Sequence, residues 1–162
     1  MTGEEILFIE MDSLMFDLAA KHEELGMKAS GEWLKALKNK TKAFTGLITG
    51  NDYTEYLVNG RKPGKFPPYT PGKGFVEIEK WIKDKGLINK IRGSLTISSL
   101  AFLIARKIAN EGTKYFQDGG TELISSVITP ERIQRIIDKV SKFKVNEFVS
   151  DITNAFKEFA PA

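Results

Sequence analysis

The stretch YTEYLVNGRKPGKFPPYTPGKGFVEIEKWIKDKG, residues 53–86, is the part of the chain around which the fold can be worked out. Its first residues fit either a short helix or a short strand, and Asn59-Gly60 then favours a sharp turn because both residues tolerate positive φ. The prolines from Pro63 to Pro71 fix φ and remove backbone donors, so no regular element crosses them. The sequence therefore predicts a stiff, irregular loop over residues 61–68. This loop displays the positive charges of Arg61, Lys62 and Lys65.

Two helices are predicted after this loop. Apolar residues recur at helical spacing from Phe75 to Ile82, and Gly86 is a natural stop. Trp81 shares the apolar face of that helix, so we expect it to be packed in the core. Residues 94–110 carry apolar side chains on most sides and end at Gly112. This pattern predicts the central buried helix of the fold.

Before the loop, the sequence predicts a helix and then a hairpin. Apolar residues at three- and four-residue steps indicate an amphipathic helix over residues 4–25, which Gly26 ends. Residues 29–50 hold two apolar runs separated by a polar stretch. Two strands joined by a turn at Asn39-Lys40 are the simplest interpretation, although a helix over residues 32–38 also fits the spacing.

The last part of the chain is predicted to be helical. Residues 122–127 form a short apolar element, and Thr129-Pro130-Glu131 indicates a helix start with Thr as the cap and Pro at the first position. The apolar phase shifts within residues 142–146, so we expect a break there. A second amphipathic helix then runs to the end, and its phenylalanines need either the core or another subunit to cover them.

Length and composition fit a single α+β domain. A chain of 162 residues suits one core, and 41% hydrophobic with 28% charged residues is typical of a globular protein. We expect a helix-rich single domain over residues 1–162, in which a small antiparallel β-hairpin packs on helices. No apolar run is long enough to predict a membrane-spanning helix.

Charge is distributed unevenly along the chain. Residues 1–30 hold seven acidic and two basic residues, a net charge of −5, whereas residues 61–92 hold nine basic and three acidic residues, a net charge of +6. This asymmetry indicates complementary faces that meet between subunits or a basic face that meets nucleic acid, and two unrelated solvated faces also fit it. In the first case, the loop of one subunit would meet the acidic residues of another subunit's first helix: Glu4, Glu5, Glu10, Asp12 and Asp17.

The sequence offers little for catalysis. There is no cysteine, and the single histidine, His22, leaves no histidine-based triad and no two-histidine metal site. The glycine-lysine motifs at residues 60–65 and 72–74 lack the spacing and the final Ser or Thr of a phosphate-binding P-loop. We interpret His22 as a polar residue near a helix end, favoured there by the helix dipole. We therefore expect no catalytic centre, no metal and no cofactor.

The run YLVNGRKPGKFPP, residues 56–68, followed by a helix with Trp81-Ile82 and Lys85-Gly86, resembles a pattern in the small neck and tail-completion proteins of tailed bacteriophages. AFLIARKIANEGT, residues 101–113, resembles the next helix of that family. The chain departs from the family after Gly112, where a short proline-containing segment usually closes the domain. The resemblance thus implies a family-like core over residues 1–116 and a C-terminal helical extension over residues 117–162.

This resemblance implies a structural virion protein, a subunit of a ring in the head-to-tail connector or neck that acts through contacts between subunits. The implied partners are identical subunits and other connector, portal or tail proteins, with packaged DNA as a further contact and no membrane. The implied location is the neck or tail region of the virion, after assembly in the host cytoplasm. We expect the assembly contact at Arg61, Lys62, Pro63, Gly64, Lys65 and Phe66.

Two other functions were weighed against this one. The first is a nucleic-acid-binding module that uses the basic segment 61–92, where Phe66, Tyr69 and Trp81 would stack on bases while lysines contact phosphates. A net charge of +3 over the whole chain is small for such a module. The second is a hydrolase, which the scarcity of histidine and cysteine disfavours.

Overall fold

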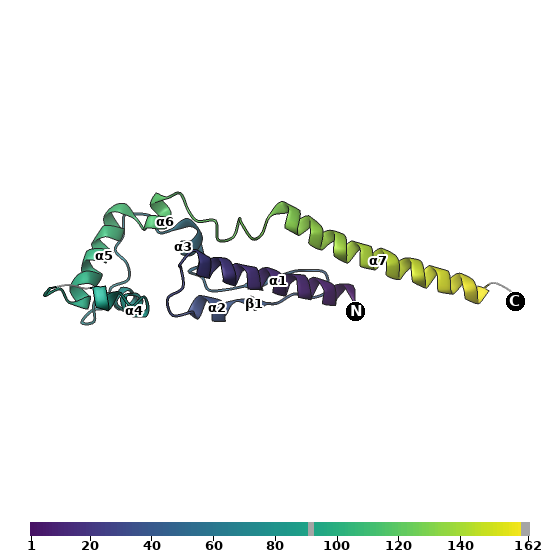
Figure 1. The fold of residues 1–162 in the computed structure, drawn as a ribbon, viewed down its shortest axis with the longest axis horizontal. Coiled ribbons are helices and arrows are strands. Elements are labelled where there is room, and N and C mark those ends of the chain that lie inside the picture. Colours follow the sequence, from purple (N-terminus) through teal and green to yellow (C-terminus); the bar gives the residue numbers. More distant parts are fainter. Residues whose placement is uncertain (91–92, 160–162) are drawn as a thin grey trace.

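The computed structural model describes residues 1–90 and 93–159, and it shows a helix-rich chain with one small two-stranded antiparallel sheet. The predicted α+β class is therefore confirmed. Figure 1 shows an elongated arrangement, with α4 and α5 at one end, α1, α2 and the sheet in the middle, and α7 reaching out at the other end. The elements in chain order are α1 (Gly3–Glu24), α2 (Glu32–Ala36), β1 (Lys38–Asn39), β2 (Ile48–Thr49), α3 (Thr54–Asn59), α4 (Val76–Asp84), the 3-10 turn η1 (Leu87–Lys90), α5 (Ile97–Glu111), α6 (Lys114–Gln117) and α7 (Pro130–Phe159).

Helix α1 forms where the apolar spacing predicts it. Thr2 and Glu5 build a capping box, in which the Thr2 hydroxyl accepts from the Glu5 amide at 3.1 Å and the Glu5 carboxylate accepts from the Thr2 amide at 2.6 Å. Leu7, Leu14 and Leu18 lie on one face at turn spacing and are buried. These leucines form the centre of the larger of two hydrophobic clusters.

The hairpin is present but shorter and later than predicted. Lys38 pairs with Thr49 and Asn39 with Ile48, and an isolated bridge between Lys42 and Thr45 closes the turn. The prediction of a turn at Asn39-Lys40 is therefore wrong. The segment expected to be the first strand forms helix α2, because one-sided burial of Trp33 beside Leu34 and Leu37 requires helical spacing.

The larger cluster joins segments from the whole length of the chain. Trp33 from α2, Leu123 and Val127 from the segment after α6, and Ile136 from α7 all pack around the leucines of α1. The short apolar element predicted at residues 122–127 consists of turns, with Leu123 and Val127 buried. These turns stay ordered because Leu123 is fully buried and the Thr121 amide and hydroxyl donate to the Val58 and Leu57 carbonyls at the end of α3. The segment TEYLVNG, residues 54–60, which the sequence left open between helix and strand, forms α3, and Gly60 follows its last residue.

The smaller cluster holds α4 against α5. Ile78 and Ile82 of α4 pack on Ala101 and Ala105 of α5, and both alanines are fully buried. Only the alanine face of α5 is covered, since Phe102 and Leu103 are nearly half exposed. The prediction that α5 is the central buried helix is therefore wrong. The placement of Trp81 in the core is also wrong, because its side chain is 42% exposed beside buried Ile82.

Helix α7 runs for 30 residues without the predicted break. The apolar phase does shift at residues 142–146, but no proline or glycine follows Pro130 before Ala160 to interrupt the backbone hydrogen bonds. The shift therefore moves the apolar stripe around the helix and does not end the helix. The first half of α7 packs on α1, and Figure 1 shows the second half continuing past the N-terminus.

Candidate functional site

The cationic loop at residues 61–68 lies on the surface as an irregular segment, as predicted. Arg61 is half-buried and Pro67 is buried, which places the two ends of the loop against the body. The other predicted contact residues are exposed: Lys62, Pro63, Gly64, Lys65 and Phe66. All six predicted residues therefore lie together in one loop, with five of them open to a partner.

Backbone hydrogen bonds brace this loop against the end of α5. The Gly64 amide donates to the Ala109 carbonyl at 2.8 Å, and the Thr113 amide donates to the Arg61 carbonyl at 2.9 Å. The Arg61 amide in turn donates to the Thr113 hydroxyl at 2.8 Å, and the Arg61 guanidinium donates to the Phe66 carbonyl at 2.9 Å. Arg61 therefore closes the loop on itself, which the sequence pattern did not reveal. Lys62 and Lys65 remain as its outward charges.

Aromatic side chains hold the far end of the loop. Phe66 and Tyr69 pack on buried Phe75, with ring centroids 6.2 Å and 5.2 Å apart, and Phe75 reaches Phe102 of α5 at 6.4 Å. Such ring pairs stabilise by about 1 kcal/mol each beyond the area they bury. The loop is therefore fixed at both ends while its tip, Lys62 to Lys65, is open.

The acidic residues of α1 already have partners within the chain. Glu10 accepts from Lys139 of α7 at 2.5 Å, and Asp17 pairs with Arg132. Glu4 accepts from the Ala43 amide at 2.8 Å, and Asp12 accepts from Asn39 at 2.9 Å. Glu5 is taken up by the capping box of α1. The acidic residues of α1 therefore bind groups of α7, of the hairpin region and of α1 itself. These five carboxylates are not free to bind the loop of another subunit.

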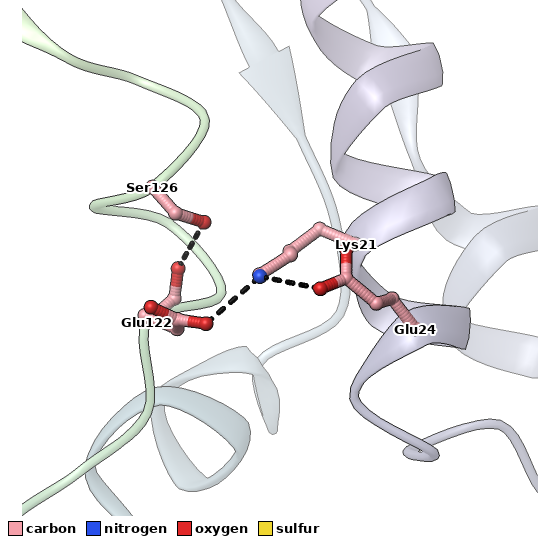
Figure 2. A network of polar contacts seen from close by, with 4 residues as sticks. All are labelled: Lys21, Glu24, Glu122 and Ser126. Atoms are coloured by element: carbon pink, nitrogen blue, oxygen red, sulfur yellow. Dashed lines mark hydrogen bonds and ion pairs between the residues drawn. The ribbon is translucent and has the colours of Figure 1, made fainter.

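A further ion-pair network fastens the end of α1 to the segment after α6. Figure 2 shows Lys21 between Glu122 and Glu24, with the Lys21 amine 2.8 Å and 3.0 Å from their carboxylates. The Ser126 hydroxyl donates to the Glu122 carbonyl at 2.6 Å and holds that turn in shape. The hydrogen bond to Glu122, and then the one to Glu24, raise the pKa of Lys21 above its usual value. This network joins α1 to the segment after α6, so we assign it a structural role.

His22 is a buried residue of the core, which corrects its interpretation as a dipole-favoured helix end. Its ring stacks on Trp33 with centroids 4.5 Å apart, and the Trp33 indole donates to the Thr54 hydroxyl at 2.9 Å. Burial first, and then the positive charge of Lys85, lower the pKa of His22. Its Nδ1 has no hydrogen-bond partner among the residues that the structure describes. The ring therefore fits the fold in its neutral form.

The second half of α7 is an apolar surface that the other described elements of the chain leave exposed. We call residues 145–158 the arm. Five apolar side chains of the arm are 40–71% exposed: Val145, Phe148, Val149, Ile152 and Phe156. Within the described residues, no hydrogen bond or ion pair joins the arm to an element outside α7. The sequence predicted an amphipathic end in need of cover, and the structure leaves it uncovered.

A shallow apolar hollow lies between α1 and α2, and we call it the groove. Met15, Phe16 and Ala19 line it from α1, while Leu34 and Leu37 line it from the region of α2. Phe16 is 74% exposed at its mouth. Asp12 forms part of the α1 wall.

Among residues 1–90 and 93–159, no group of three or more His, Cys, Asp or Glu side chains is arranged to hold a metal ion. In the same residues, no helix is both long and apolar enough to cross a membrane. Comparison with protein-family models, with curated proteins and with solved structures found no match.

Proposed function

We propose that this protein is a structural, non-enzymatic subunit of a ring in the head-to-tail connector of a tailed bacteriophage, and that it acts through contacts between subunits. The observation that carries the proposal is the braced cationic loop at residues 61–68, the segment in which the resemblance to neck proteins is most specific. The arm and the groove add two apolar surfaces of the kind that mark protein contacts.

The geometry of the loop suits a contact surface. Contacts of Arg61 with Thr113 and of Phe66 with Phe75 hold its two ends. The side chains of its tip are exposed, and the Gly64 amide fixes the tip backbone on the Ala109 carbonyl. A loop that is already ordered loses little conformational entropy when a partner binds it. Lys62 and Lys65 take part in no ion pair among the described residues, so both charges are open to acidic groups of a partner. Because the carboxylates of α1 are already occupied, we place those acidic groups on another virion protein or on another face of the subunit.

The experiment compares two double variants of equal charge. Lys62→Ser with Lys65→Ser removes the loop charges, whereas Lys73→Ser with Lys83→Ser removes two other exposed lysines. Native mass spectrometry of each purified protein measures the number of subunits in the assembly. We expect the loop variant to lose assembly and to resemble the unmodified protein at raised salt, because ions screen the same contacts. A wild-type protein that stays monomeric at all concentrations, alone and with connector proteins, would contradict the proposal.

The exposure of Trp81 favours nucleic-acid binding as the second candidate function. Its half-exposed ring and that of Phe66 lie in a segment with exposed Lys65, Lys73 and Lys83. Two other basic residues are engaged elsewhere, since Lys80 pairs with Glu32 at 2.6 Å and Lys85 donates to the Gly26 carbonyl. Arg92, also counted in this segment, lies outside the described residues.

Single-stranded DNA separates the two functions. A nucleic-acid module binds DNA with an affinity that falls steeply with salt, and either pair of lysine substitutions weakens that binding. For a ring subunit, only the loop pair changes assembly, and the Lys73 and Lys83 pair is silent. DNA binding that is weakened equally by both pairs, together with normal assembly, would favour the second function.

A further inference from the structure

The arm and the groove lie on different sides of the helix pair that α1 and α7 form. On α1, at 3.6 residues per turn, the apolar groove residues Met15, Phe16 and Ala19 lie on average about 160° around the helix from Glu10 and Asp17, which bind α7. Ser13 also lines the groove, and its hydroxyl accepts from Arg132 of α7 at 3.0 Å. On α7, the apolar stripe of the arm lies about 130° from Arg132 and Lys139, which bind α1. The apolar side chains of both surfaces therefore point away from the contact that joins the two helices, and Ser13 marks the edge of the groove nearest to that contact.

The arm does not reach the groove of its own chain. Lys144 of α7 still contacts the body, since its amine lies 5.2 Å from the centroid of the Phe44 ring and its side chain lies beside Gly3. After Lys144, no hydrogen bond or ion pair among the described residues joins α7 to another element. Beyond Lys144, the arm extends roughly 20 Å at 1.5 Å per residue, away from the body in Figure 1. Because the helix is straight on this path, its apolar stripe can be buried only against another molecule.

The charged residues beside the arm and beside the groove are complementary. Asp151 and Glu158 lie along one flank of its apolar stripe, whereas Asn146 and Thr153 lie along the other. Glu147 lies farther round the helix and already pairs with Lys144 at 2.6 Å. Beside the groove, the chain from α2 through β1 carries exposed Lys35, Lys38 and Lys40, which form no ion pair among the described residues. The opposite wall presents Asp12. An apolar helix with one acidic flank therefore fits a hollow with one lysine-bearing wall.

We propose that the arm of one copy of this chain docks in the groove of a second copy, with Phe148 and Ile152 against Met15 and Phe16, and the acidic flank towards the lysines of α2 and β1. This contact joins two different surfaces, so it repeats from copy to copy and closes into a ring if the rotation permits. The inference rests on the proposed function, for which it names one subunit contact.

Cysteine cross-linking tests the contact directly, because the chain has no cysteine of its own. One variant carries Ile152→Cys on the arm, a second carries Phe16→Cys in the groove, and the control carries Ser150→Cys on the opposite side of α7. We expect the arm and groove variants to form a disulfide only when they are mixed under oxidising conditions. The control mixed with the groove variant should stay uncross-linked.

A complementation experiment tests the direction of the contact. Phe148→Ser with Phe156→Ser inactivates the arm, and Phe16→Asp inactivates the groove; all three side chains are more than half exposed, so the fold is retained. Each variant alone should lose assembly. Their mixture should stop at a dimer, because only the intact arm of one and the intact groove of the other remain.

Three outcomes would overturn the inference. Disulfide formation by the arm variant alone would show that two arms pair with each other. Assembly of both inactivated variants to wild-type size would show that other surfaces hold the subunits, and would leave the ring proposal standing. A wild-type chain that never assembles at any concentration would remove both this contact and the proposed function.

Discussion

His22 and Trp33 form a buried, stacked pair of rings in the core. The ring of His22 stacks on that of Trp33 where the end of α1 meets α2. The two residues are 3% and 2% exposed. The other tryptophan, Trp81, lies on the outer side of α4. Both residue-scale predictions depend on these placements.

The first prediction concerns pH. Burial keeps the pKa of folded His22 below the value of about 6.5 that it has in an unfolded chain. The unfolded state therefore binds more protons as pH falls, so the free energy of unfolding is highest above about pH 7 and decreases as pH drops towards the lowered pKa. Urea unfolding at pH 7.5 and at about pH 5.5, above the range of ordinary carboxyl groups, measures this decrease.

His22→Phe is the matched variant for this prediction. It keeps an aromatic ring against Trp33 but cannot titrate, so its unfolding free energy should be the same at both pH values. An equal decrease in the variant and in the wild type would assign the effect to another group.

The second prediction compares the two tryptophans. Trp33→Ala should lower the free energy of unfolding by roughly 3–5 kcal/mol, because it removes a buried ring and leaves Thr54 without its indole partner. Trp81→Ala should lower it by about 1 kcal/mol or less, since the side chain is 42% exposed. Chemical unfolding curves of the two variants decide this, and equal losses would place Trp81 in the core after all.

At the scale of elements, the cationic loop and the end of α5 behave as one unit. Gly112 ends α5 at a φ of 78°, and a Cβ at that position would lie 2.7 Å from the Arg61 carbonyl oxygen. The same carbonyl accepts from Thr113. A loop without strand or helix is thus ordered by close backbone contact at a position that only glycine fits.

Gly112→Ala tests this coupling, and Gly119→Ala is its control. Both positions have positive φ, but a Cβ on Gly119 meets nothing within 4 Å. The control should therefore show only the backbone strain of about 1–2 kcal/mol. Gly112→Ala should lose clearly more stability and should also speed amide hydrogen exchange at Gly64, whose hydrogen bond to Ala109 holds the loop. Equal losses in the two variants would show that the loop is not coupled to α5.

The whole molecule combines two hydrophobic clusters with an uncovered arm. The larger cluster lies around α1, the smaller one lies between α4 and α5, and the second half of α7 belongs to neither. Its exposed phenylalanines have no role in holding the monomer together. We therefore expect the stability of the monomer and the proposed assembly to depend on different parts of the chain.

A chain that stops after Lys144 separates these two properties. At dilutions where both proteins are monomeric, its unfolding free energy should equal that of the full chain within roughly 0.5 kcal/mol, because the apolar side chains of the arm are 40–71% exposed and no hydrogen bond or ion pair among the described residues joins the arm to another element. At higher concentration, it should not assemble, as analytical ultracentrifugation would show. A truncated chain that unfolds much more easily would mean that the arm supports the core.

The sequence by itself determined what depends on local chemistry. Apolar spacing and a capping box place α1, consecutive prolines exclude regular structure from residues 61–68, and Thr129-Pro130-Glu131 marks the start of α7. The α+β class and the exposure of Lys62 and Lys65 follow from the same signals. The role of the loop as an assembly contact stays a prediction.

Only the tertiary structure decided which side of each element is covered. Trp81 and Ile82 are neighbours on one helix, yet α5 covers only Ile82, and α5 itself stays half open because just its alanine face meets α4. The apolar phase shift in α7 predicted a break, whereas the helix continues and the shift turns the stripe of the arm away from α1. Spacing along a chain shows that a face is apolar, but burial depends on contacts between segments distant in sequence, such as Lys139 with Glu10, and no local pattern encodes these.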